Sequence, residues 1–410
     1  MPPSHQRHGN ALRRPDRPGS RGIRQDRQGV GGHLSGTVVR RVESPADLSR
    51  FIDLPYRLHR LDLNWVPPFR AEVRTLLDRA KNPFFQHGEA EYFLAERDGE
   101  VVGRIAAIHN RLHNELHEDR VGFFGFFECI NDFPVARALI DAAANWVRSR
   151  GLDTVRGPMS FSVNDECGLL IQGFETPNTL MMPHNPPYYL PLLEAAGFTK
   201  AKDLICLEGG SLAAPVTAPE RTERAVKLIL DRYGLTIRPL DLKDFKGEVE
   251  RIKQLYNVGW EKNWGFVPMT DAEIDHLAAT FRPVVIPELV PFVMKDGVPV
   301  GFCLALPDLN EALRTNRNGR LFPAALTMLW KLKTRRLTRA RNLLLGILPE
   351  WRGKGIDSAL YHWIWTKAAA RGIGWGEAGW LLEDNAGIIQ GLTKANFTPY
   401  KTYRVFDRPA

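Results

Sequence analysis

The chain has 410 residues, of which 44% are hydrophobic and 25% charged, a composition typical of a globular protein large enough for two compact cores. No stretch approaches the roughly 18 uninterrupted apolar residues of a membrane span, which excludes a transmembrane protein. The four cysteines lie far apart, with no CxxC pair and no histidine at metal-ligand spacing. This excludes a disulfide scaffold, argues against a metal site, and favours a cytoplasmic location.

The net charge of +8 is concentrated in two segments. Residues 1–36 hold seven Arg and two Asp, and residues 318–342 hold seven Lys or Arg and no acid. The first segment lacks the apolar run of a signal peptide and predicts a disordered basic tail. That interpretation includes a mis-assigned start, and the alternative is a disordered arm that touches an anionic membrane or nucleic acid.

The rest of the chain contains two similar runs of expected elements. Each run begins with a short strand, a helix and a hairpin whose turn is Asp-Gly, at Asp98 and at Asp296. Each continues with an apolar strand, a helix that stops at glycine, and a final helix and strand. The apolar strands are predicted over 123–127 and 343–348, and the helices that stop at glycine over 134–150 and 358–371. We therefore predict two copies of one α/β unit, 37–208 and 221–410, joined by a Gly/Ala/Pro-rich linker over 209–220.

Each copy carries one insertion that the other lacks, over 156–185 in the first and within 318–342 in the second. Loops held on a rigid scaffold frequently carry function. Both insertions are therefore candidates for substrate contacts.

A phosphate-binding turn is predicted in the second copy. The apolar strand 343–348 runs through Pro349-Glu-Trp into Arg352-Gly353-Lys354-Gly355-Ile356, where a helix begins. Glycines let the backbone approach a ligand, and the free N–H groups of a first helical turn attract anions. A plain tight turn would have the same glycines.

This motif resembles the acyl-CoA-binding signature of the GNAT acetyltransferase superfamily, Arg/Gln-x-x-Gly-x-Gly/Ala. The upstream hairpin and the helix from Asn385 to Phe397 also match the order of that fold. The resemblance covers 235–410 well and 37–208 more faintly. The chain is thus identified as a tandem GNAT protein, an α/β (α+β) fold in which each unit is a mixed, mostly antiparallel sheet flanked by helices.

The resemblance implies acyl-CoA as co-substrate, with no metal. By analogy, Ile347 would bind pantetheine through its backbone and Asn385 would border the pantetheine arm. The pyrophosphate would be held by Arg352, Gly353, Lys354, Gly355 and Ile356. An amine attacks the thioester, a backbone N–H of the strand stabilises the oxyanion, and the thiolate, with a pKa near 8.5 in water, leaves with little acid help.

The chain departs from the family pattern at three places. Asp357 stands where the signature has Gly or Ala, and we expect it to cap the helix and to point toward the acceptor. The frequent tyrosine acid of the family is replaced by Leu392, which leaves Tyr403 or Tyr400 as substitutes, although either could simply pack in the core. The first copy has Cys129-Ile-Asn-Asp-Phe-Pro in place of the glycine turn and is expected to bind no CoA.

The insertion of the first copy contains polar residues that could supply a general base. Glu166 and His184 are the preferred candidates, and Asp165 is a third. A buried hydrogen-bond network that fixes a long loop explains the same residues.

The basic insertion of the second copy predicts a helix that begins near Pro323. Leu326, Leu329, Trp330 and Leu337 can share one face, with cations around it. This pattern is typical of a helix on an anionic membrane surface. A helix packed on the domain with a solvated basic face is the alternative, and nucleic acid, suggested only by Arg and Trp, is the weakest of the three interpretations.

Together these features predict an acyl-CoA-dependent N-acyltransferase with the CoA in the second copy. The favoured acceptor is a long-chain lipid amine at the inner face of a bacterial membrane, an arrangement similar to the bacterial ceramide synthase type. The alternatives are an acetyl-CoA-dependent N-acetyltransferase of small molecules or peptides, and a non-catalytic acyl-CoA sensor, which Asp357 and Leu392 would favour.

Overall fold

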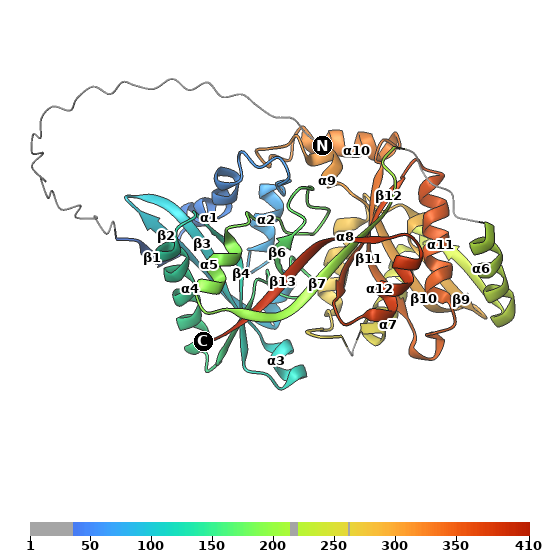
Figure 1. Ribbon diagram of the computed structural model, residues 1–410, viewed down its shortest axis with the longest axis horizontal. Helices are drawn as coiled ribbons and strands as arrows, with labels where there is room; N and C mark the ends of the chain where they lie inside the picture. The colour runs from blue at the N-terminus through green and yellow to red at the C-terminus, as the bar shows by residue number, and fades with distance from the viewer. Residues whose placement is uncertain (1–35, 214–219, 261–262) are drawn as a thin grey trace, which may run out of the picture. The chain divides into compact units, whose positions relative to one another are not determined.

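The computed structural model describes residues 36–213, 220–260 and 263–410 (Figure 1). Residues 36–410 form one compact unit. The predicted basic tail lies outside the described residues except for Gly36, and so do residues 214–219 of the predicted linker.

The fold is α/β, with one large, mostly antiparallel sheet flanked by helices. The elements of the first half are β1 (Val38–Arg41), α1 (Pro45–Leu58), α2 (Arg70–Leu76), β2 (Gly88–Arg97), β3 (Glu100–Asn110), α3 (Arg111–His117), β4 (Val121–Cys129), α4 (Phe133–Arg148), β5 (Thr154–Gly157), β6 (Leu169–Gln172), α5 (Tyr189–Ala195) and β7 (Thr199–Gly210). Those of the second half are α6 (Glu220–Tyr233), β8 (Leu235–Pro239), α7 (Phe245–Trp260), α8 (Asp271–Phe281), β9 (Pro291–Lys295), β10 (Val298–Pro307), α9 (Asn310–Leu313), α10 (Ala324–Lys333), β11 (Arg339–Ile347), α11 (Ile356–Ala369), β12 (Trp375–Leu382), α12 (Ala386–Lys394) and β13 (Thr398–Pro409).

Local sequence signals explain where these elements begin and turn. Both Asp-Gly hairpins are confirmed, because Asp98 and Asp296 adopt φ values of 51° and 49°, as a type I′ turn requires. The helix α1 begins after Ser44, whose side chain accepts a hydrogen bond from the Asp47 N–H while the Asp47 carboxylate accepts one from the Ser44 N–H. The Asp132 side chain caps α4 in the same way, by accepting from the Val135 N–H.

The two halves share one sheet because they exchange their last strands. The strand order is β1-β2-β3-β4-β5-β13-β7-β12-β11-β10-β9-β8, with β6 beside β13. Strand β13, the end of the second half, pairs with β5 of the first, and β7 pairs with β12 of the second. Gly209 and Gly210, which the sequence assigns to the linker, therefore belong to β7, where they oppose Gly376 and Trp375.

The basic insertion differs from its prediction in two respects. Its helix, α10, spans only Ala324–Lys333, and Arg339 and Arg341 belong to the strand β11. Leu326, Leu329 and Trp330 are exposed, but Leu337 is buried and does not share their face. Leu337 follows the end of the helix and packs inward, because the chain there turns toward β11. No helix in the described ranges is long and apolar enough to cross a bilayer.

Candidate active site

A cleft opens where two parallel strands of the second half separate. Strands β11 and β12 pair only over Arg339–Asn342 and Trp375–Ala378. On the other side of β11, Asn342 and Leu344 oppose Ala305 and Leu304, two consecutive residues of β10. Leu343 is therefore a bulge that has no register partner in β10 or in β12. The gap beyond the last pair is a cleft of about 540 Å³.

The turn that follows β11 forms one end of this cleft. Gly353 and Gly355 adopt left-handed φ values of 72° and 80°, which are strained for any other residue type. Gly355 is the N-cap of α11, and among the described residues no side chain caps this helix. The N–H groups of its first turn are therefore available to an anion.

Most of the residues expected to bind CoA surround the cleft. Its walls include Ile347, Arg352, Gly353, Ile356 and Asn385. The Arg352 Nε donates to the Ile347 carbonyl oxygen at 3.3 Å. Lys354 and Gly355 do not line it; the Lys354 ammonium lies 4.4 Å from the ring centre of Trp351.

Asp357 lines the cleft but does not cap the helix, contrary to expectation. It is the second residue of α11, because the left-handed Gly355 takes the N-cap position. Leu392, at the position of the family's tyrosine, is buried in an apolar cluster with Leu207 and Ala378.

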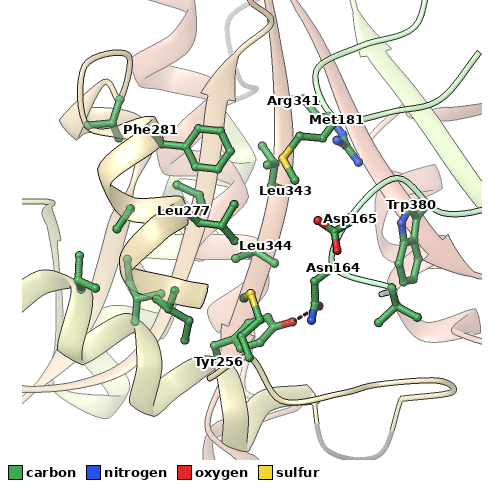
Figure 2. Close-up of a pocket in the computed structure, with 18 of the residues that line it drawn as sticks. Asn164, Asp165, Met181, Tyr256, Leu277, Phe281, Arg341, Leu343, Leu344 and Trp380 are labelled. Atoms are coloured by element: carbon green, nitrogen blue, oxygen red, sulfur yellow. Dashed lines mark hydrogen bonds between the residues drawn. The ribbon is translucent and has the colours of Figure 1, made fainter. Parts of the chain in front are cut away.

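An apolar cavity of about 150 Å³ adjoins the cleft (Figure 2). Its walls come mainly from α7, α8, the segment between them and β11, and include Ile252, Leu277 and Phe281, with Leu304 of β10. Trp264, Leu343, Leu344, Gly379 and Trp380 line both the cavity and the cleft. A ligand that reaches the end of the cleft at the bulge therefore meets the apolar cavity directly.

The insertion of the first half contributes Asp165 to the wall of the apolar cavity. Asp165 lines the cavity, and Figure 2 shows its carboxylate between Arg341 and Trp380. The Ser162 hydroxyl donates to Asp165 Oδ2 at 3.0 Å. Burial nevertheless raises the pKa of Asp165 to about 7, the range in which a carboxylate serves as a general base near neutral pH.

The other three predicted catalytic residues lie outside the walls of both spaces. The His184 Nε2 lies 2.8 Å from Asp62 Oδ2, and burial lowers the pKa of His184. Glu166 is an exposed residue of the insertion, and its backbone carbonyl oxygen accepts a hydrogen bond from the Ser160 N–H at 2.9 Å. The Tyr403 side chain is fully buried in β13, and its hydroxyl has no hydrogen-bond partner among the described residues.

The cavity walls also contain residues that were not predicted from the sequence, among them Tyr256, Trp264, Arg341 and Trp380. Arg341 is buried, and its Nε lies 2.9 Å from Glu377 Oε1 on β12. The Thr179 hydroxyl donates to the same carboxylate at 2.8 Å, and the Tyr400 hydroxyl also donates to it. A cation at the start of the apolar run 343–348 was the available signal, but Arg341 was counted with the basic insertion.

The corresponding gap in the first half is filled by the chain itself. Strands β4 and β5 are parallel over Val121–Phe123 and Thr154–Arg156. Beyond them the Met159 N–H donates to the Phe124 carbonyl oxygen at 2.7 Å. The Met159 carbonyl lies so close to Gly125 that any Cβ there would collide with it. The chain itself therefore fills the space beside these two strands.

Comparison with known proteins connects this geometry to a family. No protein-family model matches the chain. The bacterial ceramide synthase of Caulobacter vibrioides is 36% identical over 373 residues, which cover 90% of this chain and 96% of that protein. Protein YghO of Escherichia coli is 35% identical over 379 residues, covering 90% of this chain and 95% of YghO.

Solved structures agree on the fold. A tandem GNAT protein from the clavulanic acid biosynthesis pathway aligns with a TM-score of 0.55 and 10% identity, covering 91% of this chain and 98% of that one. A GCN5-related N-acetyltransferase from Sphaerobacter thermophilus aligns with a TM-score of 0.50 and 15% identity, covering 91% and 95%. Since its relatives align over nine-tenths of the chain and its fold is that of tandem GNAT proteins, the chain is an acyl-CoA-dependent N-acyltransferase of the family that includes bacterial ceramide synthase and YghO.

Proposed function

We propose that the enzyme transfers an acyl group from acyl-CoA to the amine of a long-chain lipid, with a sphingoid base as the favoured acceptor. The observation that carries this proposal is the apolar cavity that shares Leu343, Leu344 and Trp380 with the cleft. Each methylene buried there would contribute about 0.8 kcal/mol to the binding free energy, so the cavity favours a hydrocarbon chain over a polar metabolite. The name of the 36% identical relative, bacterial ceramide synthase, points to the same class of acceptor.

The cleft would hold the coenzyme. The first-turn N–H groups of α11, with Arg352, Gly353, Lys354, Gly355 and Ile356, would bind the pyrophosphate. Ile347 and Asn385 would flank the pantetheine arm, which lies between the separated strands β11 and β12. The thioester carbonyl would then lie at the Leu343 bulge, where a backbone N–H can stabilise the oxyanion.

Asp165 is the base that the geometry favours, because it alone of the four predicted catalytic residues lines the cavity. Its carboxylate would take the proton of the attacking amine as the new C–N bond forms and the CoA thiolate leaves. Glu166 is exposed and His184 is paired with Asp62, and neither lines the cavity or the cleft. Burial holds the pKa of Tyr403 well above its usual range, so that its hydroxyl stays protonated. His184, through its contact with Asp62, and the buried Tyr403 ring would then support the packing of the insertion and take no part in proton transfer.

We also propose that the reaction takes place at the inner face of a membrane, where a lipid amine is found. The exposed apolar side chains and cations of α10 and its flanks support this location.

The test is release of free thiol from palmitoyl-CoA or acetyl-CoA, with amines of increasing chain length. Thiol release that needs the long acyl-CoA, with a KM for the amine or acyl-CoA that falls about fourfold per added methylene until the cavity is full, supports the proposal. Release only with acetyl-CoA and short polar amines would instead identify a small-molecule N-acetyltransferase. No release with any pair, together with acyl-CoA binding, would identify a sensor.

A further inference from the structure

We propose that two segments, one from each half, form a single docking face for an anionic phospholipid bilayer. The segments are the leucine loop, residues 59–65 after α1, and the basic segment, residues 314–336 around α10. The face would deliver the lipid substrate of the proposed function, on which this inference rests. Its apolar members are Leu61, Leu63, Leu321, Phe322, Leu326, Leu329 and Trp330.

These side chains are unusually exposed for their size. Leu61 and Leu63 are 83% and 76% exposed, more than any other large apolar side chain among the described residues. Phe322 and Leu326 are 65% and 60% exposed. Single exposed leucines are ordinary, but a group of large apolar residues on two adjoining segments is typical of an interaction surface.

Specific contacts join the two segments. The Arg317 guanidinium donates to the carbonyl oxygens of His59 and Asp62 at 3.0 and 2.5 Å, and also to that of Trp65. The Arg70 N–H donates to the Gly319 carbonyl oxygen at 3.0 Å. Figure 1 shows the chain that follows α1 beside the segment that leads into α10.

Apolar packing beneath the face reinforces these bonds. Val66 and Phe69 pack in one buried cluster with Ala324, and Met328 of α10 packs against it. The leucine loop and the basic segment are therefore held as one surface, although they are far apart in the sequence.

The charge of this face complements an anionic membrane. The sequence from 314 to 338 contains no Asp or Glu. Its exposed cations are Arg314, Arg320, Lys333, Arg335 and Arg336. The Arg336 guanidinium lies 4.5 Å from the ring centre of Trp330, so that a cation and an interfacial aromatic residue stand together. Cations attract anionic headgroups and apolar side chains enter between them, whereas a nucleic acid would use only the cations.

The underside of the face leads to the cavity. Met328 and Leu332 of α10 pack in the same cluster as Leu180 and Phe281. Phe281 and the residue after Leu180, Met181, line the apolar cavity. Figure 2 shows Phe281 and Met181 at the end of the cavity opposite Tyr256. A hydrocarbon chain leaving the bilayer under α10 would thus meet the apolar cavity with little exposure to water.

The experiment measures sedimentation of the full chain with vesicles of phosphatidylglycerol and phosphatidylcholine, and with phosphatidylcholine alone. We expect binding to the anionic vesicles, and a loss of about tenfold or more in the double variant L61E/L63E. The double variant R335E/R336E should lose about as much on anionic vesicles. The matched control L116E/L228E changes two exposed leucines of α3 and α6, outside the proposed face, and should bind as the unaltered protein does.

Unchanged vesicle binding by L61E/L63E, or no binding by the unaltered protein, would overturn the docking face. So would binding to a DNA duplex that displaces the vesicles and is insensitive to L61E/L63E. Thiol release from acyl-CoA with a water-soluble amine, measured without vesicles, reports on the reaction separately and should be unchanged in L61E/L63E. Vesicle binding without any thiol release would therefore contradict the proposed function and leave the docking face standing.

Discussion

The Tyr256 hydroxyl in α7 donates a hydrogen bond to Asn164 Oδ1, 2.6 Å away in the insertion of the first half (Figure 2). The Asn164 amide in turn donates to the Val267 carbonyl oxygen at 3.2 Å, in the segment between α7 and α8. Asn164, the residue that precedes Asp165, is therefore hydrogen-bonded to two parts of the second half. The two halves build the junction of cavity and cleft together.

We predict that Y256F destabilises the protein and also lowers activity. The ring stays in place, but Asn164 Oδ1 loses its donor in a poorly solvated position, which costs about 1–3 kcal/mol. Urea unfolding measures this cost, and kcat shows whether Asp165 has moved.

A double-mutant cycle with N164A isolates the contact between the two side chains. The loss in the double variant should be clearly smaller than the sum of the two single losses. Additive losses would mean that the hydrogen bond does not couple the halves.

Sequence patterns predicted those features that local chemistry determines. The Asp98 and Asp296 turns need only an Asp-Gly pair between two strands, and the glycine turn at Gly353 and Gly355 needs only the strand and helix on either side. The exchange of β7 and β13 has no such signal, because an antiparallel strand carries the same pattern whichever copy it joins. The repeat therefore indicated two units but not their shared sheet.

The sequence alone did not identify the general base among the candidates, because adjacent polar residues of a loop have the same local sequence pattern. Asp165 and Glu166 are adjacent, yet only Asp165 lines the cavity. That choice depends on how the loop turns at Ser162 and on the tie from Asn164 to Tyr256, both of which require tertiary contacts. Arg341 was misplaced for a similar reason, since nothing in the sequence separates the end of the basic segment from the start of β11.

We predict that kcat/KM rises with pH through about 7 and then levels off. Burial raises the pKa of Asp165 to about 7, so that its proton-accepting form prevails only above that pH. The variant D165N should lower kcat/KM by about 10²- to 10⁴-fold and remove the rise. The matched control E166Q should keep the rise; if E166Q removes it and D165N does not, Glu166 is the base.

We predict that the ionisation of Asp165 lowers the stability of the protein as pH rises, although it raises kcat/KM. The pKa of Asp165 is about 7 in the folded protein against 3.8 for the reference carboxyl. Between these values the folded state holds a proton that the unfolded state has lost, so the contribution of Asp165 to stability declines as pH rises. Urea unfolding at several pH values should show this decline in the unaltered protein and less of it in D165N; an equal slope in both would contradict the buried carboxyl.

We predict one acyl-CoA site per chain, in the second half. Met159 occupies the equivalent gap of the first half, where it bonds to Phe124 and leaves no space beside Gly125. Titration calorimetry with a non-hydrolysable acyl-CoA analogue should give a stoichiometry of about one, and a stoichiometry of two would refute the assignment.

The variant G355A should weaken the binding of that analogue about tenfold. An alanine would be strained at the φ of 80° found here, and its Cβ would lie 2.7 Å from Ile229 Cδ1, so that side chain must also move aside. The control G391A adds a methyl group in open space on α12 and should bind normally. Equal loss in both variants would trace the effect to general destabilisation and not to the turn.

Finally, we predict that the cavity sets the preferred chain length. Leu277 of α8 lines the cavity, so L277W should fill part of it (Figure 2). Because the lost space is apolar, kcat/KM should fall steeply for substrates with the longest hydrocarbon chains and little for those with short ones. The last methylenes of a long chain would lose the binding free energy of about 0.8 kcal/mol that each gains in the unaltered cavity. The matched control A279W places the same ring on the exposed side of α8 and should leave the chain-length profile unchanged. Parallel losses at every chain length in L277W would mean that the cavity supports the fold and does not hold the hydrocarbon chain.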